Sequence, residues 1–288
     1  MNTTIVTAYY DLSGNKKEYL ETGRRLMRLE HPLIIYTGDQ ESSDYILNMR
    51  KEYNLLDKTI VYIIPFTDLY FFKYKEQINK NREIYWPTKD ERCKTDIHIL
   101  LISKFYFMKK SIQENKFNTE YFSWMDFNIL TKDPHNSTNY TSDKVYNKLN
   151  TIFNCPRPKF TITVIGYWNP DDYNDLKLFY SNYKYICTGL FYTTEREIGL
   201  TIMDKVIEYA EYITQQGYGH GEEQLLGHII DQNIDSFTLT LGDYQDAIDN
   251  YYNITTNIYY IKRVLDEYES QNKLRFEKLL KDNNLFFF

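Results

Sequence analysis

The stretch Tyr121-Phe122-Ser123-Trp124-Met125-Asp126-Phe127-Asn128-Ile129 decides the predicted fold. It begins as an aromatic and apolar run, which predicts a buried strand, and an acid and an amide follow where that strand ends. Side chains at i and i+2 of an extended chain point to the same side, so Asp126 and the amide oxygen of Asn128 can reach one ion. Such oxygen ligands suit Mg²⁺ or Mn²⁺. The pattern predicts a divalent-cation site, with a plain polar turn as the alternative.

Three apolar runs precede this strand, at residues 4–10, 32–37 and 59–64, and polar segments with helical character separate them. Strands that alternate with helices predict a parallel, doubly wound sheet. Ligands of such sheets bind beyond the carboxyl ends of the strands. The residues expected at that edge are Tyr9, Tyr10, Asp11, Thr37 and Gly38. No glycine-rich dinucleotide motif or P-loop follows the first run, so those two classes are not supported.

A helix is predicted immediately before the Asp126 strand, with Thr95 or Asp96 as its cap. Its apolar residues recur at helical spacing on one stripe, namely Ile97, Leu101, Phe105, Met108 and Ile112. Lys104 lies at the border of that stripe. Its side chain is either solvated, with its stem along apolar surface, or offsets phosphate charge beside the next strand.

The remaining chain predicts further strands and helices around two irregular segments. Residues 66–93 show no clear period, and residues 131–158 are polar and proline-containing, which indicates loops. Strands are expected near residues 160–166, 185–191 and 236–241. A charged helix at about residues 257–281 is expected to act as a lid, a packing arm or an oligomer contact. No linker is evident, so residues 1–288 are predicted to form one domain.

A second chemically suggestive stretch runs from Gly217 to Leu226 and holds several glycines. Glu222 and Glu223 open a helix there, a position that the helix dipole favours without any function. The functional alternative is that either acid faces a sugar, orients its hydroxyls or acts as a base. His220 is interpreted as a hydrogen-bonded loop residue rather than a metal ligand.

Composition excludes several other classes of protein. The 288-residue chain carries a net charge of −6 and no long basic run, which disfavours nucleic-acid partners. Three separated cysteines, Cys93, Cys155 and Cys187, indicate reduced thiols in a cytoplasmic protein. The N-terminal residues enter a strand directly, without a signal-peptide pattern, and no apolar run is long enough to span a membrane.

The order of these parts resembles the HtrL/YibB (WlaTC) family of glycosyltransferases and, more loosely, other nucleotide-diphospho-sugar enzymes of the GT-A type. The likeness rests on the runs 4–11, 33–37, 102–106, 121–126 and 221–224. It implies an α/β fold of the GT-A (Rossmann-like) class, with a mixed, mainly parallel central sheet flanked by helices and a C-terminal helical arm. A nucleotide-binding half of about residues 1–130 and an acceptor half of about 131–256 would make up the domain before that arm.

The resemblance also implies transfer of a sugar from a nucleotide-diphosphate donor to a glycan or other hydroxyl acceptor. UDP is the default nucleotide. A divalent cation, Mn²⁺ or Mg²⁺, would assist. Carried onto this sequence, Asp126 would bind the metal with Asn128 beside it, and Asp243 would replace an absent C-terminal histidine ligand. The other implied site residues are Thr7, Tyr9 and Asp11 around the nucleoside, Lys104 near the diphosphate, and Glu222 and Glu223 toward the acceptor.

Two other functions remain open. A sugar nucleotidyltransferase would use a similar sheet, although the segment Asp11–Asn15 is a poor version of its glycine-rich basic loop. A catalytically inactive, glycan-binding relative is favoured by Asn128, because this amide replaces the second acid of the common D-x-D motif and binds a cation less strongly.

Overall fold

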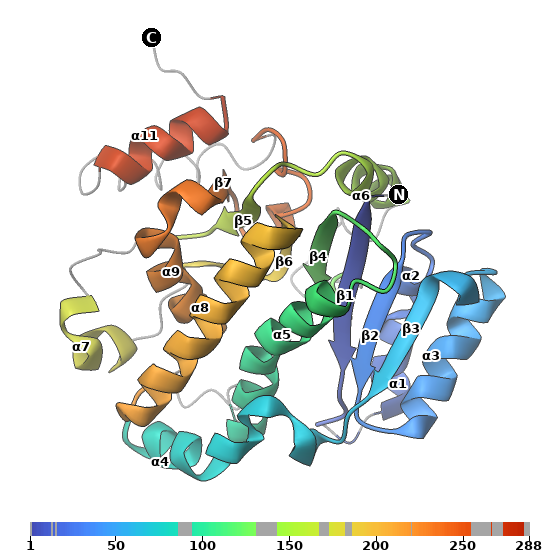
Figure 1. Cartoon of the computed structure of the whole chain (residues 1–288), viewed down its shortest axis with the longest axis horizontal. Coiled ribbons are helices and arrows are strands. Elements are labelled where there is room, and N and C mark those ends of the chain that lie inside the picture. The colour runs from blue at the N-terminus through green and yellow to red at the C-terminus, as the bar shows by residue number, and fades with distance from the viewer. Residues whose placement is uncertain are drawn as a thin grey trace.

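The computed structural model is built around one central sheet with helices on both faces (Figure 1). It describes residues 2–12, 14, 16–85, 94–130, 143–166, 173–181, 186–219, 221–254, 266 and 273–284. Within these ranges the sheet contains seven strands in the order β3-β2-β1-β4-β6-β5-β7. The strands are β1 (Thr3–Tyr9), β2 (Leu33–Thr37), β3 (Thr59–Ile63), β4 (Tyr121–Met125), β5 (Phe160–Val164), β6 (Cys187–Glu195) and β7 (Phe237–Leu241).

Strand direction defines two parts of this sheet. Strands β3, β2, β1 and β4 are mutually parallel, so their carboxyl ends lie at one edge. Strand β6 runs antiparallel to both β4 and β5, and β7 again pairs with β5 in parallel. The predicted fold class, an α/β protein with a mixed, mainly parallel sheet flanked by helices, is therefore confirmed.

Two apolar cores lie on opposite faces of the sheet, because neighbouring strand residues point in opposite directions. In β1, Val6 packs into the core formed with α5, α8 and α9, whereas Ile5 packs into the core formed with α2, α3 and α6. Figure 1 shows α5 and α8 running side by side across one face. The helices are α1 (Lys16–Thr22), α2 (Arg24–Met27), α3 (Gln40–Glu52), α4 (Lys75–Tyr85), α5 (Thr95–Glu114), α6 (Lys144–Asn154), α7 (Leu176–Ser181), α8 (Arg196–Gln215), α9 (Glu222–Gln232) and α11 (Lys273–Asp282).

Several local predictions were wrong. Residues 66–85 are not irregular: they form short 3-10 turns and α4, which pack through long-range contacts that a single segment does not reveal. Helix α6 occupies residues 144–154 of the predicted loop region, whose residues 131–142 lie outside the described ranges. Helix α5 begins after Lys94 without a side-chain cap, so neither Thr95 nor Asp96 has the predicted capping role.

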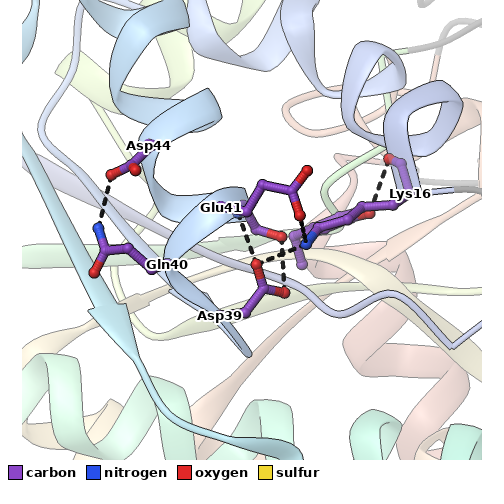
Figure 2. Close-up of polar contacts among 7 residues, drawn as sticks. Lys16, Asp39, Gln40, Glu41 and Asp44 are labelled. Atoms are coloured by element: carbon purple, nitrogen blue, oxygen red, sulfur yellow. Dashed lines mark hydrogen bonds and ion pairs between the residues drawn. The ribbon is translucent and has the colours of Figure 1, made fainter.

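Ion pairs join the amino-terminal end of α3 to the segment that follows β1 (Figure 2). The ammonium of Lys16 lies 2.7 Å from Asp39 Oδ1 and 2.7 Å from Glu41 Oε2. Asp39 also caps α3 by accepting a hydrogen bond from the backbone N–H of Ser42. The hydroxyl of Tyr9 donates to the carbonyl of Lys16 at 3.0 Å, so the same contacts fix a residue at the end of β1.

The C-terminal helix covers the outer edge of the sheet, where β7 is the last strand (Figure 1). Asp282 accepts a hydrogen bond from the backbone N–H of Leu239 at 3.0 Å, and Asn283 donates to the Leu239 carbonyl at 2.8 Å. These side chains satisfy the unpaired groups of an edge strand, which otherwise invite pairing with another chain. Of the predicted helical arm at residues 257–281, only residue 266 and α11 lie within the described ranges.

We expect Asn283→Leu to lower the free energy of unfolding by about 1–2 kcal/mol, because it leaves the buried carbonyl of Leu239 without its donor. Chemical denaturation measures this loss. The control is Asn284→Gly, a change in the next, exposed residue that keeps the positive φ of 54° accessible. Equal stability of Asn283→Leu and the unmodified protein would contradict the edge-covering role.

Among the helices of the described segments, none is both long and apolar enough to cross a membrane. The prediction that residues 1–288 form one domain was based on the lack of an evident linker in the sequence, and it stays a prediction.

Candidate active site

A cavity of about 320 Å³ opens where the carboxyl ends of β1 and β4 meet α5. Its walls are mostly aromatic and aliphatic, with a few polar groups at one end. This is the composition typical of small-molecule sites, and the position is the one expected for ligands of an open α/β sheet. The lining residues are Ala8, Tyr9, Tyr10, Asp11, Leu12, Tyr19, Ile97, Leu100, Leu101, Lys104, Trp124, Asp126, Phe127 and Asn128.

Asp126 is the first residue after β4 and lines the cavity, with its side chain 34% exposed. Its backbone N–H donates to the carbonyl of Leu190, which continues the pairing of β4 with β6 by one residue. The indole N–H of Trp124 donates to Asp126 Oδ1 at 2.7 Å. This hydrogen bond fixes the orientation of the carboxylate at the cavity wall.

Asn128 lines the same cavity, although β4 ends at Met125 and residues 127–130 form a turn instead of the extended chain that the i, i+2 argument assumed. Its amide nitrogen donates to the hydroxyl of Tyr19 at 3.1 Å. Of the two polar atoms of this amide, the oxygen is the one that can act as a cation ligand. In the part of the chain that the structure describes, no cluster of three or more His, Cys, Asp or Glu side chains is suited to a metal ion. The oxygens of Asp126 and Asn128 are of the kind that Mg²⁺ or Mn²⁺ accepts beside a bound phosphate group, and their role as cation ligands stays a prediction.

The three residues predicted around a nucleoside have different environments. Tyr9 and Asp11 line the cavity, and Asp11 accepts a hydrogen bond from the backbone N–H of Gly14. Thr7 is completely buried within β1 and is not among the lining residues. Direct contact between Thr7 and a ligand of this cavity would therefore require the strand to move.

Lys104 reaches the cavity from α5, but its ammonium is turned toward two acids. It lies 3.0 Å from Glu222 Oε1, 3.0 Å from the carbonyl oxygen of Gly189 and 3.5 Å from Asp126 Oδ1. Burial lowers the pKa of Lys104, but the charges of Asp126 and Glu222 outweigh burial and hold the pKa above its ordinary value. The structure thus joins three predicted site residues that lie far apart in the sequence.

Glu223 is buried beside this group rather than in the cavity. Its carboxylate accepts a hydrogen bond from the hydroxyl of Tyr244, and the thiol of Cys187 lies 3.8 Å from its carbonyl oxygen. Burial and the neighbouring charge of Glu222 raise the pKa of Glu223 to about 8. Neither acid lines the cavity, so their predicted contact with an acceptor is not part of the observed arrangement.

The raised pKa makes stability depend on pH. Between about pH 5 and pH 8 the folded protein keeps a proton on Glu223 that the unfolded chain has lost, so we expect stability to fall by about 1–3 kcal/mol as pH rises through this window. Glu223→Gln should flatten the profile, because the amide does not titrate and still accepts from Tyr244. Denaturation at several pH values measures both slopes, and equal slopes would contradict the assignment.

Asp243 lies after β7, at the same edge of the sheet but outside the cavity. Its carboxylate accepts a hydrogen bond from the backbone N–H of Tyr244 and so caps a short 3-10 turn. That turn places Tyr244 against Glu223. The structure therefore does not bring Asp243 together with Asp126 and Asn128, and His220 lies outside the described residues.

Sequence reasoning missed two parts of the site. Trp124 was interpreted only as a strand residue, although strand alternation places it on the same side as Asp126. Ile97 and Leu101 were assigned to a buried stripe, yet both are only half-buried and line the cavity with Leu100. The sequence held no signal that could have revealed the second part, because an apolar stripe has the same pattern whether it packs into a core or lines a cavity.

The fold and the cavity together define an α/β protein with a cavity at the carboxyl ends of its central parallel strands. The chain belongs to the HtrL_YibB family, whose model matches residues 1–252 and is described as a bacterial protein of unknown function. The predicted family is thereby confirmed. Among curated proteins, none matches the chain significantly.

Similar solved structures include three with glycosyltransferase or synthase names. Apo mouse xyloside xylosyltransferase 1 aligns with a TM-score of 0.43 and 12% identity, over 90% of this chain and 96% of that chain. Core-mannan synthase A (CmsA/Ktr4) from Aspergillus fumigatus, in a Mn/GDP form, gives 0.48 and 10%, over 83% and 72%. Galactosyltransferase LgtC, with donor and acceptor sugar analogs, gives 0.42 and 9%, over 78% and 70%. At these values the similarities assign no role to any residue.

Proposed function

We propose that this protein is a glycosyltransferase that moves a sugar from a nucleotide-diphosphate donor to a hydroxyl group of a glycan or another acceptor. The observation that carries the proposal is the carboxylate of Asp126, which is held by Trp124 at the end of β4 and faces the cavity. Asn128 supplies a second oxygen on the same wall. This is the ligand chemistry that a diphosphate-bound Mg²⁺ or Mn²⁺ requires.

In this proposal Asp126 and Asn128 hold the cation together with oxygens of the donor diphosphate. When bound, the cation would offset the negative charge that develops on the leaving diphosphate. Oδ1 of Asp126 accepts from the indole of Trp124 and from the ammonium of Lys104. The other carboxylate oxygen is therefore the one that would bind the cation. The acceptor hydroxyl would then attack the anomeric carbon of the donor sugar. The bond from that carbon to the diphosphate breaks, the nucleoside diphosphate leaves, and the hydroxyl proton passes to an oxygen of the leaving diphosphate or to water.

The aromatic and apolar walls would bind the rest of the substrates. Tyr9 and Tyr10 lie at the end of β1, and Leu100 and Leu101 form the opposite wall on α5. Closely packed apolar walls exclude water from the reacting groups and strengthen the electrostatic interactions among them. Glu222 and Glu223 act on these electrostatics through Lys104, rather than by contact with the acceptor.

The experiment is a thermal-shift screen with four kinds of ligand: nucleoside diphosphates, nucleotide sugars, nucleoside triphosphates paired with sugar phosphates, and glycans. Each is tested with and without Mn²⁺, and an assay of nucleoside-diphosphate release follows. Stabilisation by one pair of cation and nucleotide sugar, with turnover when an acceptor is added, supports the proposal. Stabilisation only by a nucleoside triphosphate with a sugar phosphate would replace it with a nucleotidyltransferase. Stabilisation by glycans alone would indicate the inactive binding relative.

A further inference from the structure

The ammonium of Lys104 lies where it can oppose a cation bound to Asp126. Its side chain is 2% exposed, and Nζ lies 3.5 Å from Asp126 Oδ1 but 3.0 Å from Glu222 Oε1. The shorter distance shows that Glu222 is the closer partner. Lys104 therefore places a positive charge beside Asp126, while its closer ion pair is with Glu222.

Two further contacts hold this ammonium in place. The carbonyl oxygen of Gly189 accepts from it at 3.0 Å, and the ring of Trp124 lies 5.4 Å away, within the range of cation–π attraction. A Cβ at Gly189 would lie 2.6 Å from Glu222 Oε1, so only glycine at this position leaves room for the acid. The fixed charge thus depends on α5, β6 and α9 together.

We propose that Lys104 prevents divalent cations from binding Asp126 alone, so that a cation enters the cavity only together with a diphosphate. This inference rests on the proposed function and adds an order of binding to it. Of the two proposed ligands only Asp126 is charged, and the ammonium of Lys104 lies 3.5 Å from its Oδ1, so Lys104 offsets the charge with which Asp126 would attract a free cation. A diphosphate brings the negative charge that is missing.

Glu222 acts as a positioning residue in this arrangement. It retains Lys104 at 3.0 Å and so limits the attraction of the ammonium toward Asp126. Without that retention, Lys104 would pair with Asp126 more closely and compete with every cation. Changes at Lys104 and at Glu222 therefore alter cation binding in opposite directions.

The experiment measures Mn²⁺ binding directly, by the loss of the electron paramagnetic resonance signal of free Mn²⁺. The titration is made with Mn²⁺ alone, with UDP and with inorganic pyrophosphate. Each series is compared with the same solution without protein, because both diphosphates bind Mn²⁺ themselves, and only the additional loss of signal counts as binding to the protein. The double variant Lys104→Met, Glu222→Gln removes both charges of the buried pair, which proteins tolerate better than removal of one. We expect it to bind Mn²⁺ alone about tenfold more tightly than the unmodified protein, or about 1.4 kcal/mol. Glu222→Gln alone should weaken binding of Mn²⁺ with UDP or pyrophosphate.

The matched control is Lys109→Met, Asp204→Asn, which removes another ion pair made by α5. It should leave both titrations unchanged. Mn²⁺ that binds the unmodified protein equally well with and without a diphosphate would overturn this inference but leave the proposed function standing. If the unmodified protein binds no Mn²⁺ in any of the three titrations and the double variant gains affinity for Mn²⁺ alone, the role of Lys104 is supported and the result counts against the proposed function.

Discussion

Asp126→Asn is expected to lower the affinity for Mn²⁺ with a nucleoside diphosphate on the order of a hundredfold or more, and sugar transfer with it. The substitution removes the only negative charge of the two-residue ligand set formed with Asn128. The fold should persist, because the asparagine oxygen can still accept from Trp124, and Lys104 keeps Glu222 as its partner. Isothermal titration and a thermal melt measure the two effects separately.

The control for this substitution is Asp204→Asn, which also removes a carboxylate that faces a lysine of α5. Asp204 does not line the cavity, so nucleotide binding should be unaffected. If Asp126→Asn unfolds the protein while Asp204→Asn does not, then Asp126 has a structural role. If Asp126→Asn binds cation and nucleotide as before, the cation lies elsewhere and the proposed function loses its main support.

Lys104→Met should produce the largest loss of stability, about 3–5 kcal/mol, because it leaves Glu222 buried without its countercharge. The carbonyl oxygen of Gly189 loses its donor in the same variant. Chemical denaturation measures the free energy of unfolding, and the melting temperature should fall by roughly 10 °C.

A second substitution tests the physical reason for that loss. Adding Glu222→Gln to Lys104→Met should recover most of the stability, because the remaining polar group is neutral. The control Lys109→Met breaks an ion pair that is more exposed, and should cost only about 0–1 kcal/mol. If the double variant is no more stable than Lys104→Met alone, the loss arises from packing around the lysine stem rather than from the unpaired acid.

Much of the structure of residues 1–130 could be predicted from the sequence. The apolar runs that became β1, β2, β3 and β4 are continuous, and each ends at a polar or proline residue. Since parallel strands share one carboxyl edge, Asp126, Tyr9 and Asp11 were expected near one another, and all three line the cavity. This part of the site required only local patterns and one general rule of α/β folds.

The contacts of Lys104 could not be predicted in the same way. A lysine at the border of an apolar stripe is usually solvated, and its stem alone does not reveal a buried partner. Glu222 lies 118 residues further along the chain, and a pair of acids at a helix start has its own local explanation. Only the docking of α9 against β6 reveals that the lysine and this acid form a pair.

By itself, the sequence of this protein determined which central segments form strands, the edge of the sheet at which these strands end, and the acid that follows β4. These features depend on local periodicity and on residues next to each other in the chain. The tertiary structure decided that β6 enters antiparallel beside β4 and carries Gly189 to the ammonium of Lys104. It also decided which acids are buried, since burial and pairing depend on residues that only packing brings together.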